Sequence, residues 1–209
     1  MTGDSRHRQA QLARGIQQKR FCNCDLAGTN WVEIGADLQG FSFAGANLAG
    51  AIFDGLVLDQ ASFIGANLIG ASFKFTTLTK ARFERLDLTE ARFDYADLTQ
   101  ATLYRVRSHW GHFGYAGLEA ALLYDSDFAH AEFCYAILQR THLRRSSLKS
   151  ANLRKADFCG ARLHYVDAWG AHLPDGRQAR STNDLLPFTW GRCHSNEVTV
   201  AYQRLPEGS

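Results

Sequence analysis

The sequence predicts an all-β solenoid, and a five-residue period, a second inward position and a 20-residue repeat are the observations that predict it. From Leu38 to Leu163, 25 of the 26 residues met at steps of five are Leu or Phe, with Ser108 as the exception. We call this position i; at i−2, Ala occurs 17 times in 26. A period of five fits neither the 3.6-residue turn of a helix nor the alternation of a strand. We therefore expect a coil with the large residue i and the small residue i−2 pointing inward.

The 20-residue repeat gives the number of sides of the coil. Residues 43–51 (FAGANLAGA) and 63–71 (FIGANLIGA) are identical at seven of nine positions and lie 20 residues apart. Four segments of five residues therefore make one turn, and we name the sides by their first inward residue: face A from Leu38, face B from Phe43, face C from Leu48 and face D from Phe53. Hydrogen bonds between turns would give a rise of about 4.8 Å.

A recurring A(D/N)LxX motif carries a family resemblance. It occurs at residues 36–38, 46–48, 66–68, 96–98 and 151–153, and the phase holds from residue 36 to 165. The chain thus resembles the pentapeptide-repeat family. This resemblance implies a right-handed quadrilateral parallel β-helix with a short N-terminal cap and an irregular C-terminal tail. The best-studied relatives are dimeric rods that protect DNA gyrase and topoisomerase IV by imitating duplex DNA through an acidic surface.

The chain divides into three regions. Residues 1–20 form an N-terminal cap, which the i, i+4 spacing of Leu12 and Ile16 predicts to be helical. Residues 21–173 form the pentapeptide-repeat β-helix. Its first coil, marked by Phe21, Leu26 and Trp31, is offset by two residues from Leu38, so we expect a bulge or a small insertion over residues 32–35.

Residues 174–209 form a C-terminal cap or a dimerisation tail. The Pro174-Asp175-Gly176 turn ends the repeat. Farther on, Val198, Val200 and Tyr202 alternate with other residues, which suits a strand better than a helix. This tail is where we expect a homodimer to form.

The composition limits the partners and the cellular compartment that we expect for the protein. Twenty-three Lys and Arg against 21 Asp and Glu leave a net charge of +2 in 209 residues, too balanced to indicate a nucleic-acid or membrane partner. No apolar stretch is long enough for a membrane span, and the N-terminus lacks the apolar core of a secretory signal. The five scattered cysteines favour reduced thiols over a disulfide framework, so we expect a cytoplasmic protein.

Candidate catalytic groups are poorly grouped, so we expect no enzyme activity, catalytic residue, cofactor or metal. Cys22 and Cys24 are one residue apart and lack a second metal-binding pair, whereas Cys134 and Cys159 fall on different sides of the coil. The recurring glycines at i+2 suit corners better than phosphate binding. We interpret the weak repeat at His109, Trp110 and His112 as a locally distorted coil, with a small ligand cleft as the alternative.

If i and i−2 point inward, then i−1, i+1 and i+2 form outward columns. Face A has a net charge of −3 and an acidic set comprising Asp37, Asp59, Asp97, Glu119 and Asp157. Face B has a net charge of +4, and its arginines are Arg82, Arg85, Arg105, Arg144, Arg145 and Arg162. On face D, the i+2 column has an aromatic run consisting of Phe75, Tyr95, Tyr115 and Tyr135. This run is either a ladder that stabilises the rod or a docking strip for a protein.

Three hypotheses follow. The leading one is a non-enzymatic scaffold that binds a protein partner through the aromatic column and the adjacent basic face. The alternative is a protection or immunity factor that binds DNA gyrase or topoisomerase IV as a partial DNA mimic. Seven turns at a rise of about 4.8 Å make a rod about 34 Å long. Duplex DNA carries one negative charge per ~1.7 Å, so a mimic of that length would need a charge of about −20, whereas this repeat sums to +1. The third is direct nucleic-acid binding by the Arg and Tyr side chains of face B, which would be weak and salt-sensitive.

Overall fold

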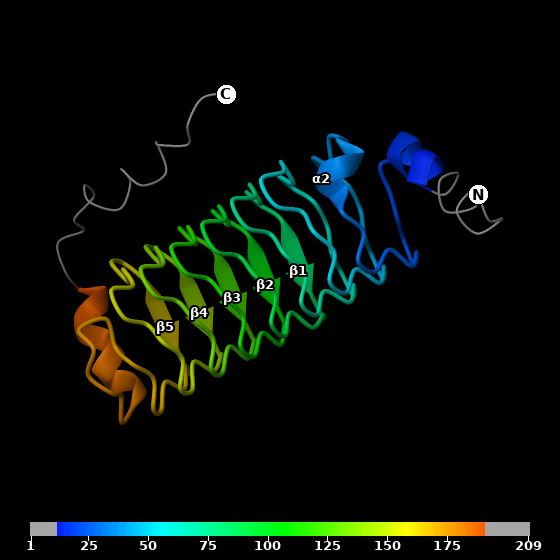
Figure 1. Cartoon of the computed structure of the whole chain (residues 1–209). Coiled ribbons are helices and arrows are strands. Elements are labelled where there is room, and N and C mark those ends of the chain that lie inside the picture. The colour runs from blue at the N-terminus through cyan, green and yellow to red at the C-terminus, as the bar shows by residue number, and fades with distance from the viewer. Residues whose placement is uncertain (1–11, 191–209) are drawn as a thin grey trace, which may run out of the picture.

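The computed structural model describes residues 12–190, which form a rod of stacked coils with a helix against each end (Figure 1). Bridges such as Ser42 with Ser62 and Asn47 with Asn67 pair residues 20 positions apart in parallel. The amide of Phe43 donates to the carbonyl of Ser62 at 2.7 Å, and the amide of Ser62 donates to the carbonyl of Phe41 at 2.8 Å. The predicted parallel β-helix with a 20-residue coil is therefore confirmed.

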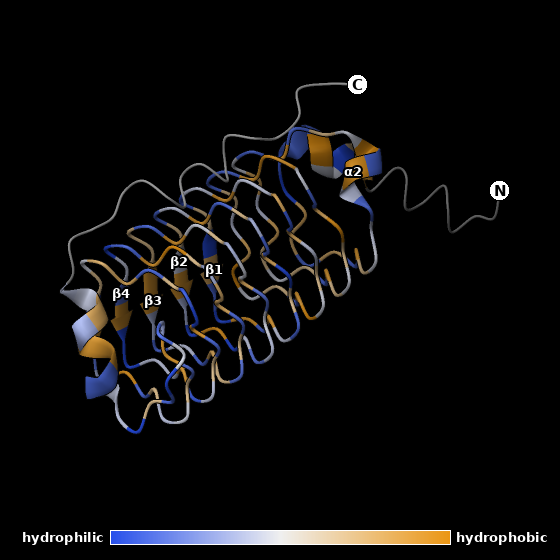
Figure 2. Ribbon diagram, turned by 60° about the vertical axis from the view of Figure 1, so that its left-hand side comes forward, coloured by the Kyte–Doolittle hydropathy of each residue, from blue (hydrophilic) through white to orange (hydrophobic). Residues whose placement is uncertain are grey.

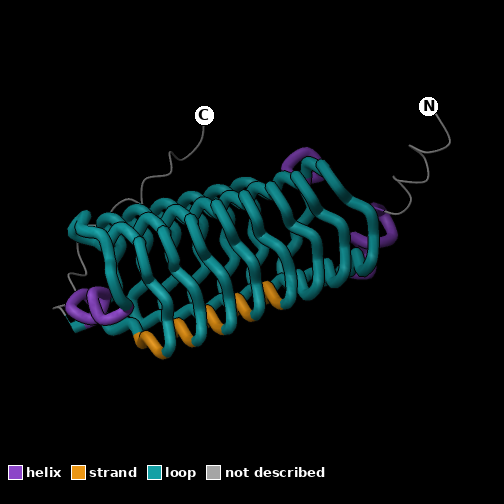
Figure 3. Tube along the Cα trace, turned by 90° about the horizontal axis from the view of Figure 1, so that it is seen from below, coloured by secondary structure: helices purple, strands orange, loops and turns teal. Residues whose placement is uncertain are grey.

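One face carries the regular strands. The structure forms a five-stranded parallel sheet in the order β1-β2-β3-β4-β5, and the other sides contribute isolated bridges. All five strands lie along face B, in a line on one side of the tube (Figure 3). Their bounds are β1 Arg82–Glu84, β2 Thr102–Tyr104, β3 Leu122–Tyr124, β4 His142–Arg144 and β5 Arg162–His164.

The core is a stack of apolar side chains along the axis. Phe63, Leu68 and Phe73 are all fully buried, as the five-residue period predicts. Hydrophobic and hydrophilic residues accordingly alternate along the coils (Figure 2). The phenylalanines of face D stack at 4.7–5.0 Å between ring centroids, and these rings are Phe53, Phe73, Phe93, Phe113 and Phe133. Because i−2 residues such as Ala71 are small, the rings have room to overlap.

Each corner of the coil needs a left-handed residue at i+2. Gly50 has φ 64°, and Glu90 and Trp110 adopt φ 60° and 58° at equivalent corners. An L-residue in this region costs roughly 1–2 kcal/mol relative to a right-handed conformation. The hydrogen bonds between coils hold these residues in place, so the later coils tolerate side chains where the early coils have glycine.

The D/N position of the motif has a structural role. At i−1, the Asp97 carboxylate accepts a hydrogen bond from the Thr99 amide at 2.9 Å, and the Asn67 side chain accepts one from the Ile69 amide at 3.3 Å. Asp and Asn side chains commonly satisfy a backbone amide two residues ahead in this way. A carboxylate and an amide oxygen serve equally well here, so the motif requires an acceptor rather than a negative charge.

The predicted insertion is a short helix. Asp25 pairs with Asn47, a separation of 22 residues rather than 20, because the chain between them includes α2, Trp31–Ile34. The Asn30 side chain accepts a hydrogen bond from the Val32 amide at 3.2 Å, and Gly35 ends the helix at φ 63°. The phase offset therefore results from one added turn of helix, which keeps Trp31 buried in the core.

A helix packs against each end of the rod. Residues 12–18 are helical, and Leu12 and Ile16 pack against the core cluster. At the other end lies the 3-10 helix η1, Thr182–Thr189, which buries Leu185. The strand expected at residues 198–202 lies outside the described residues, as do residues 191–209 of the predicted dimerisation tail, residues 174–209.

The cysteines require one correction. Cys22, Cys24 and Cys134 are free, whereas Cys159 is disulfide-bonded. The expectation of reduced thiols is therefore wrong for Cys159, because spacing along a sequence does not reveal which cysteines meet in space. Among residues 12–190, no helix has the length and apolar character needed to cross a bilayer.

Candidate interaction surfaces

The aromatic run of face D forms a continuous stack, which we call the aromatic ladder: Phe75, Tyr95, Tyr115 and Tyr135. Its ring centroids are 5.0, 4.8 and 4.8 Å apart, and neighbouring planes differ by at most 9°. Each residue has φ between 57° and 60°, so the corner geometry points all four rings outward. Phe75 is 50% exposed and Tyr135 is 41% exposed. The rings therefore stabilise one another and still present their edges to solvent.

Tyr115, in the middle of the ladder, is uncharged at neutral pH. Burial raises the pKa of the Tyr115 hydroxyl, and the neighbouring Tyr135 and Tyr95 raise it further because a second phenolate beside the first would be repelled. Tyr115 thus keeps its hydroxyl proton, and the rings of the ladder offer apolar contact area to a partner.

The basic face does not border the ladder. After Tyr95 the chain runs through residues 96–100 of face A before it reaches β2 on face B. The ladder lies at the corner between faces D and A, and face B is on the opposite side of the coil from face D. The prediction that the aromatic column and the basic face are adjacent is therefore wrong, because a four-sided coil places face A between them.

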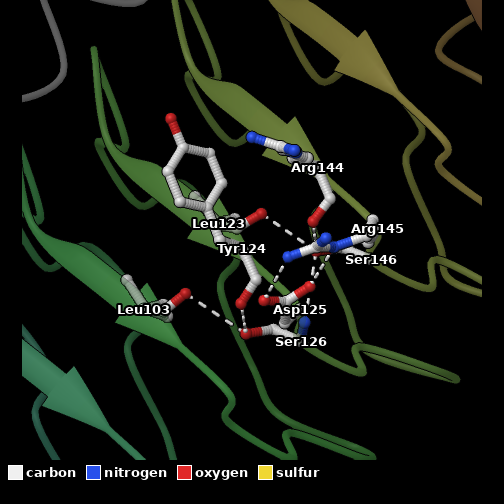
Figure 4. A network of polar contacts seen from close by, with 8 residues as sticks. All are labelled: Leu103, Leu123, Tyr124, Asp125, Ser126, Arg144, Arg145 and Ser146. Carbon is white, nitrogen blue, oxygen red and sulfur yellow. Dashed lines mark hydrogen bonds and ion pairs between the residues drawn. The ribbon is translucent and has the colours of Figure 1, made fainter.

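Two of the arginines on face B are engaged in ion pairs. Arg82 pairs with Glu84 at 2.7 Å. Arg145 donates from Nε to Asp125 Oδ1 at 2.5 Å and from Nη2 to Oδ2 at 2.9 Å, one coil apart (Figure 4). The hydrogen bond from Arg145 lowers the pKa of Asp125. Arg145 therefore links two neighbouring coils, whereas Arg82 pairs within β1, and both side chains are less available to a ligand.

The other four arginines of face B are exposed, and no ion pair is formed by any of them within residues 12–190. The guanidinium of one of them, Arg105, lies over the Tyr104 ring, 5.1 Å from the ring centroid. They are Arg85, Arg105, Arg144 and Arg162.

A serine network joins the coils beside this face. Ser126 Oγ accepts a hydrogen bond from the Val106 amide at 3.1 Å. It also donates to the carbonyl of Tyr124 at 2.8 Å (Figure 4). Ser146 repeats the arrangement one coil later, accepting from the Ser126 amide at 3.3 Å and donating to the carbonyl of Leu123 at 2.9 Å. In the sequence these serines are merely exceptions to Ala at i−2.

A shallow groove of about 480 Å³ lies at the same corner, between faces B and C. Leu86 and Val106 are buried in its floor, and Arg85, Arg105 and Asp125 line one side. Sequence reasoning missed this groove. The signal in the sequence was Leu86 and Val106, which replace Ala at successive i−2 positions of this corner.

The acidic set of face A is committed to local contacts. Asp37 accepts from the Gln39 amide at 3.0 Å. Asp59 accepts from the Thr79 amide at 2.9 Å, and Asp157 accepts from the Gln139 side chain at 2.6 Å. Glu119 forms an ion pair with Arg140. These carboxylates stabilise corners and neighbouring coils, so their negative charge is partly balanced in place.

The weak repeat is a regular coil, which corrects the interpretation of a distorted one. The Ser108 amide donates to the Asp127 carbonyl at 2.7 Å, so the hydrogen bonds between coils continue there. His109 Nε2 lies 2.6 Å from Asp127 Oδ2, and Trp110 stacks on His130 at 4.4 Å.

Burial raises the pKa of Asp127, but hydrogen bonds from His109 and the Ala129 amide outweigh it, and the net direction is down. Within residues 12–190, no three His, Cys, Asp or Glu side chains are grouped closely enough to hold a metal ion.

Comparisons with known proteins agree with this architecture. The model of the pentapeptide repeats family matches residues 34–68, 42–79, 66–103 and 126–164, with eight copies. The structure of QnrB1, a plasmid-mediated fluoroquinolone resistance protein, is 17% identical, covers 75% of this chain and 87% of its own, and superposes with a TM-score of 0.54.

Two other solved structures are less similar in shape. HetL, a pentapeptide repeat protein involved in heterocyst differentiation regulation in the cyanobacterium Nostoc, is 22% identical over 77% of this chain and 89% of its own, with a TM-score of 0.23. A pentapeptide repeat protein of the Arabidopsis thaliana thylakoid lumen is 26% identical over 56% of this chain and 70% of its own, with a TM-score of 0.30. No curated protein matches the chain in sequence.

Proposed function

This chain belongs to the pentapeptide-repeat family, and we propose that it is a non-enzymatic scaffold that binds a protein partner through the aromatic ladder. The observation that carries this proposal is the run of four outward rings stacked 4.8–5.0 Å apart, of which Phe75, Tyr95 and Tyr135 are exposed and Tyr115 is partly buried. Tyrosine is enriched at protein interfaces because it combines a large apolar surface with a hydroxyl.

The rigidity of the ladder supports binding. A side chain that becomes ordered on binding costs ~0.5–1.5 kcal/mol, but rings already held by their neighbours have little freedom left to lose. Tyr115 is sandwiched between Tyr95 and Tyr135 in almost parallel planes, which differ by 4° and 1°. The ladder also borders the acidic face A, so the partner that fits best has an apolar strip beside basic residues.

A matched pair of variants tests this proposal. Tyr95, Tyr115 and Tyr135 are changed together to Ser, and in the control the face B tyrosines Tyr104, Tyr124 and Tyr165 are changed to Ser. Affinity capture from the native host, read by mass spectrometry, should recover a protein with the wild-type chain and with the face B variant, but not with the ladder variant.

Circular dichroism must show the same β signal for all three proteins. If the ladder variant recovered the partner as well as the wild-type chain does, a docking role for the ladder would be contradicted. If only the face B variant lost the partner, the binding surface would lie on face B.

The alternative function is topoisomerase binding as a partial DNA mimic, and the shared fold with QnrB1 favours it. If this function holds, purified protein restores supercoiling by DNA gyrase in the presence of a fluoroquinolone. A variant with Asp97→Asn and Glu119→Gln should then lose the effect, because both changes remove negative charge and Asn still supplies the acceptor that Thr99 needs. Supercoiling that is unaffected by the protein would exclude this function.

A further inference from the structure

A pocket at the N-terminal end of the rod combines thiols with cationic side chains. It has a volume of about 290 Å³, just below the usual range for small-molecule sites, and lies between the N-terminal helix and the first coil. The side chains that matter here are Arg14, Gln18, Arg20, Cys22 and Cys24. The pocket shares no residue with the aromatic ladder; its Arg20 pairs in parallel with Ser42, so Arg20 lies at the N-terminal end of face B.

The Cys22 thiol is placed where its anion is stabilised. Arg20 Nη2 lies 3.7 Å from Cys22 Sγ, and Ser42 Oγ lies 3.6 Å from it. Burial raises the pKa of Cys22, but the hydrogen bonds from Ser42 and Arg20 and the charge of Arg20 outweigh it, so the pKa is lowered. Cys22 is also partly exposed, so a reagent can reach it.

The other free thiols in the described part of the chain are placed differently. Cys24 Sγ donates to the Cys22 carbonyl at 3.5 Å. Burial raises the pKa of Cys134, and the nearby Glu132 raises it further. A thiol reacts as its thiolate, so Cys134 is disfavoured as a nucleophile.

The cations in the pocket determine the kind of reagent. Arg14 and Arg20 are exposed, and neither forms an ion pair with a carboxylate in residues 12–190. Guanidinium groups bind carboxylates through paired hydrogen bonds, so the pocket favours a ligand that carries carboxylates.

We propose that Cys22 is a modification site that forms a mixed disulfide with a small disulfide bearing carboxylates, which Arg14 and Arg20 bind. The Cys22 thiolate attacks one sulfur of the reagent, a bond forms between these two sulfurs, and the S–S bond of the reagent breaks. The second sulfur leaves as a thiolate and takes a proton from water. The exchange needs no other oxidant, and one disulfide replaces another.

Oxidised glutathione is the anionic probe, and cystamine is a cationic disulfide for comparison. The purified full-length chain is incubated with each probe, and the adducts are located by peptide mass spectrometry. With oxidised glutathione we expect Cys22 to be modified several-fold faster than Cys134, because Arg20 and Ser42 stabilise the Cys22 thiolate whereas burial disfavours that of Cys134. Cys22 should also react faster than Cys24, whose Sγ instead contacts the Cys22 carbonyl. Cystamine should react with Cys22 several-fold more slowly than oxidised glutathione, because the arginines repel it.

Two variants complete the test. Arg20→Gln should slow modification of Cys22 by oxidised glutathione several-fold and reduce the preference over cystamine. Lys19→Gln is the matched control, because Lys19 lies over the Phe41 ring and should leave the rate unchanged. Equal rates at Cys22 and Cys134, equal rates with the two disulfides, or a wild-type rate in Arg20→Gln would each overturn the proposal.

Discussion

Ser108 lies in the core, at an inward i position where the repeat otherwise has Leu or Phe. The residue is fully buried, and its hydroxyl has no hydrogen-bond partner. The next residue in its column is Phe128, whose ring packs against Phe113 at 6.0 Å. A large residue beside a small one keeps this part of the core filled, while the hydroxyl contributes an unsatisfied polar group.

We predict that Ser108→Ala stabilises the protein. A buried hydroxyl without a partner costs about 1–3 kcal/mol, and Ala removes it with almost no change in volume. Ser126→Ala is the control: its hydroxyl has partners, so its loss should cost ~1 kcal/mol. Urea denaturation should therefore shift to a higher midpoint for Ser108→Ala and to a lower one for Ser126→Ala. Equal shifts in the same direction would contradict this account.

The sequence distinguishes these two serines by position but does not reveal their bonding. At i, the side chain points to the core axis, away from backbone carbonyls; at i−2, it lies at a corner, close to the carbonyls of the preceding coil. The aromatic ladder could be predicted because it depends on register alone. The contact of Arg20 with Cys22 could not, because it depends on side-chain conformations at an end where the repeat has stopped.

At the scale of elements, the packing of the N-terminal helix depends on Gly15. A Cβ at this position would overlap the ring of Phe21, which is a fully buried residue of the first coil. Gly15 therefore lets the helix approach the end of the core. By contrast, Gly50 has open space around it and is needed for its φ of 64°.

We predict that Gly15→Ala and Gly50→Ala both destabilise the protein, in different places. The clash at Gly15 should cost about 1–3 kcal/mol and loosen the helix. The left-handed strain at Gly50 should cost about 1–2 kcal/mol, partly offset by the reduced freedom of the unfolded chain. Hydrogen exchange should increase over residues 12–21 in Gly15→Ala and around the corner at residue 50 in the other variant. Unchanged exchange over residues 12–21 would show that the helix does not require the close contact.

The sequence predicted the elements unevenly. The phase offset at Trp31 predicted an insertion, but four residues are too few to show a helical period, so α2 was not predicted as a helix. Within residues 12–190 the regular strands lie on face B alone, whereas the five-residue pattern is the same on every side. The phase of the five-residue repeat therefore predicts the path of the chain and the direction of each side chain. It does not predict which face forms regular strands, because that depends on local backbone geometry.

At the scale of the whole molecule, the rod has one continuous core, but its stability does not depend on any single central coil. Each coil contacts only its neighbours, so stability should be the sum of coil and interface contributions. The phenylalanines of face D make this testable. Phe93 stacks between Phe73 and Phe113 at 5.0 Å on both sides, in the middle of the rod. Phe53 stacks on Phe73 at 4.9 Å and on Trp31 at 5.6 Å, near the N-terminal end.

We predict that Phe93→Ala and Phe53→Ala remove similar contacts but have different effects on unfolding. Each substitution should cost about 3–5 kcal/mol, as is usual for a buried Phe. In Phe93→Ala the weakened interface lies between two long stacks, so urea unfolding should broaden and hydrogen exchange should increase on both sides of residue 93. In Phe53→Ala the increase should be confined to the coils before residue 73, while the later coils stay protected. If both variants increased exchange equally from residue 21 to 173, the rod would unfold as a single unit and the nearest-neighbour account would be wrong.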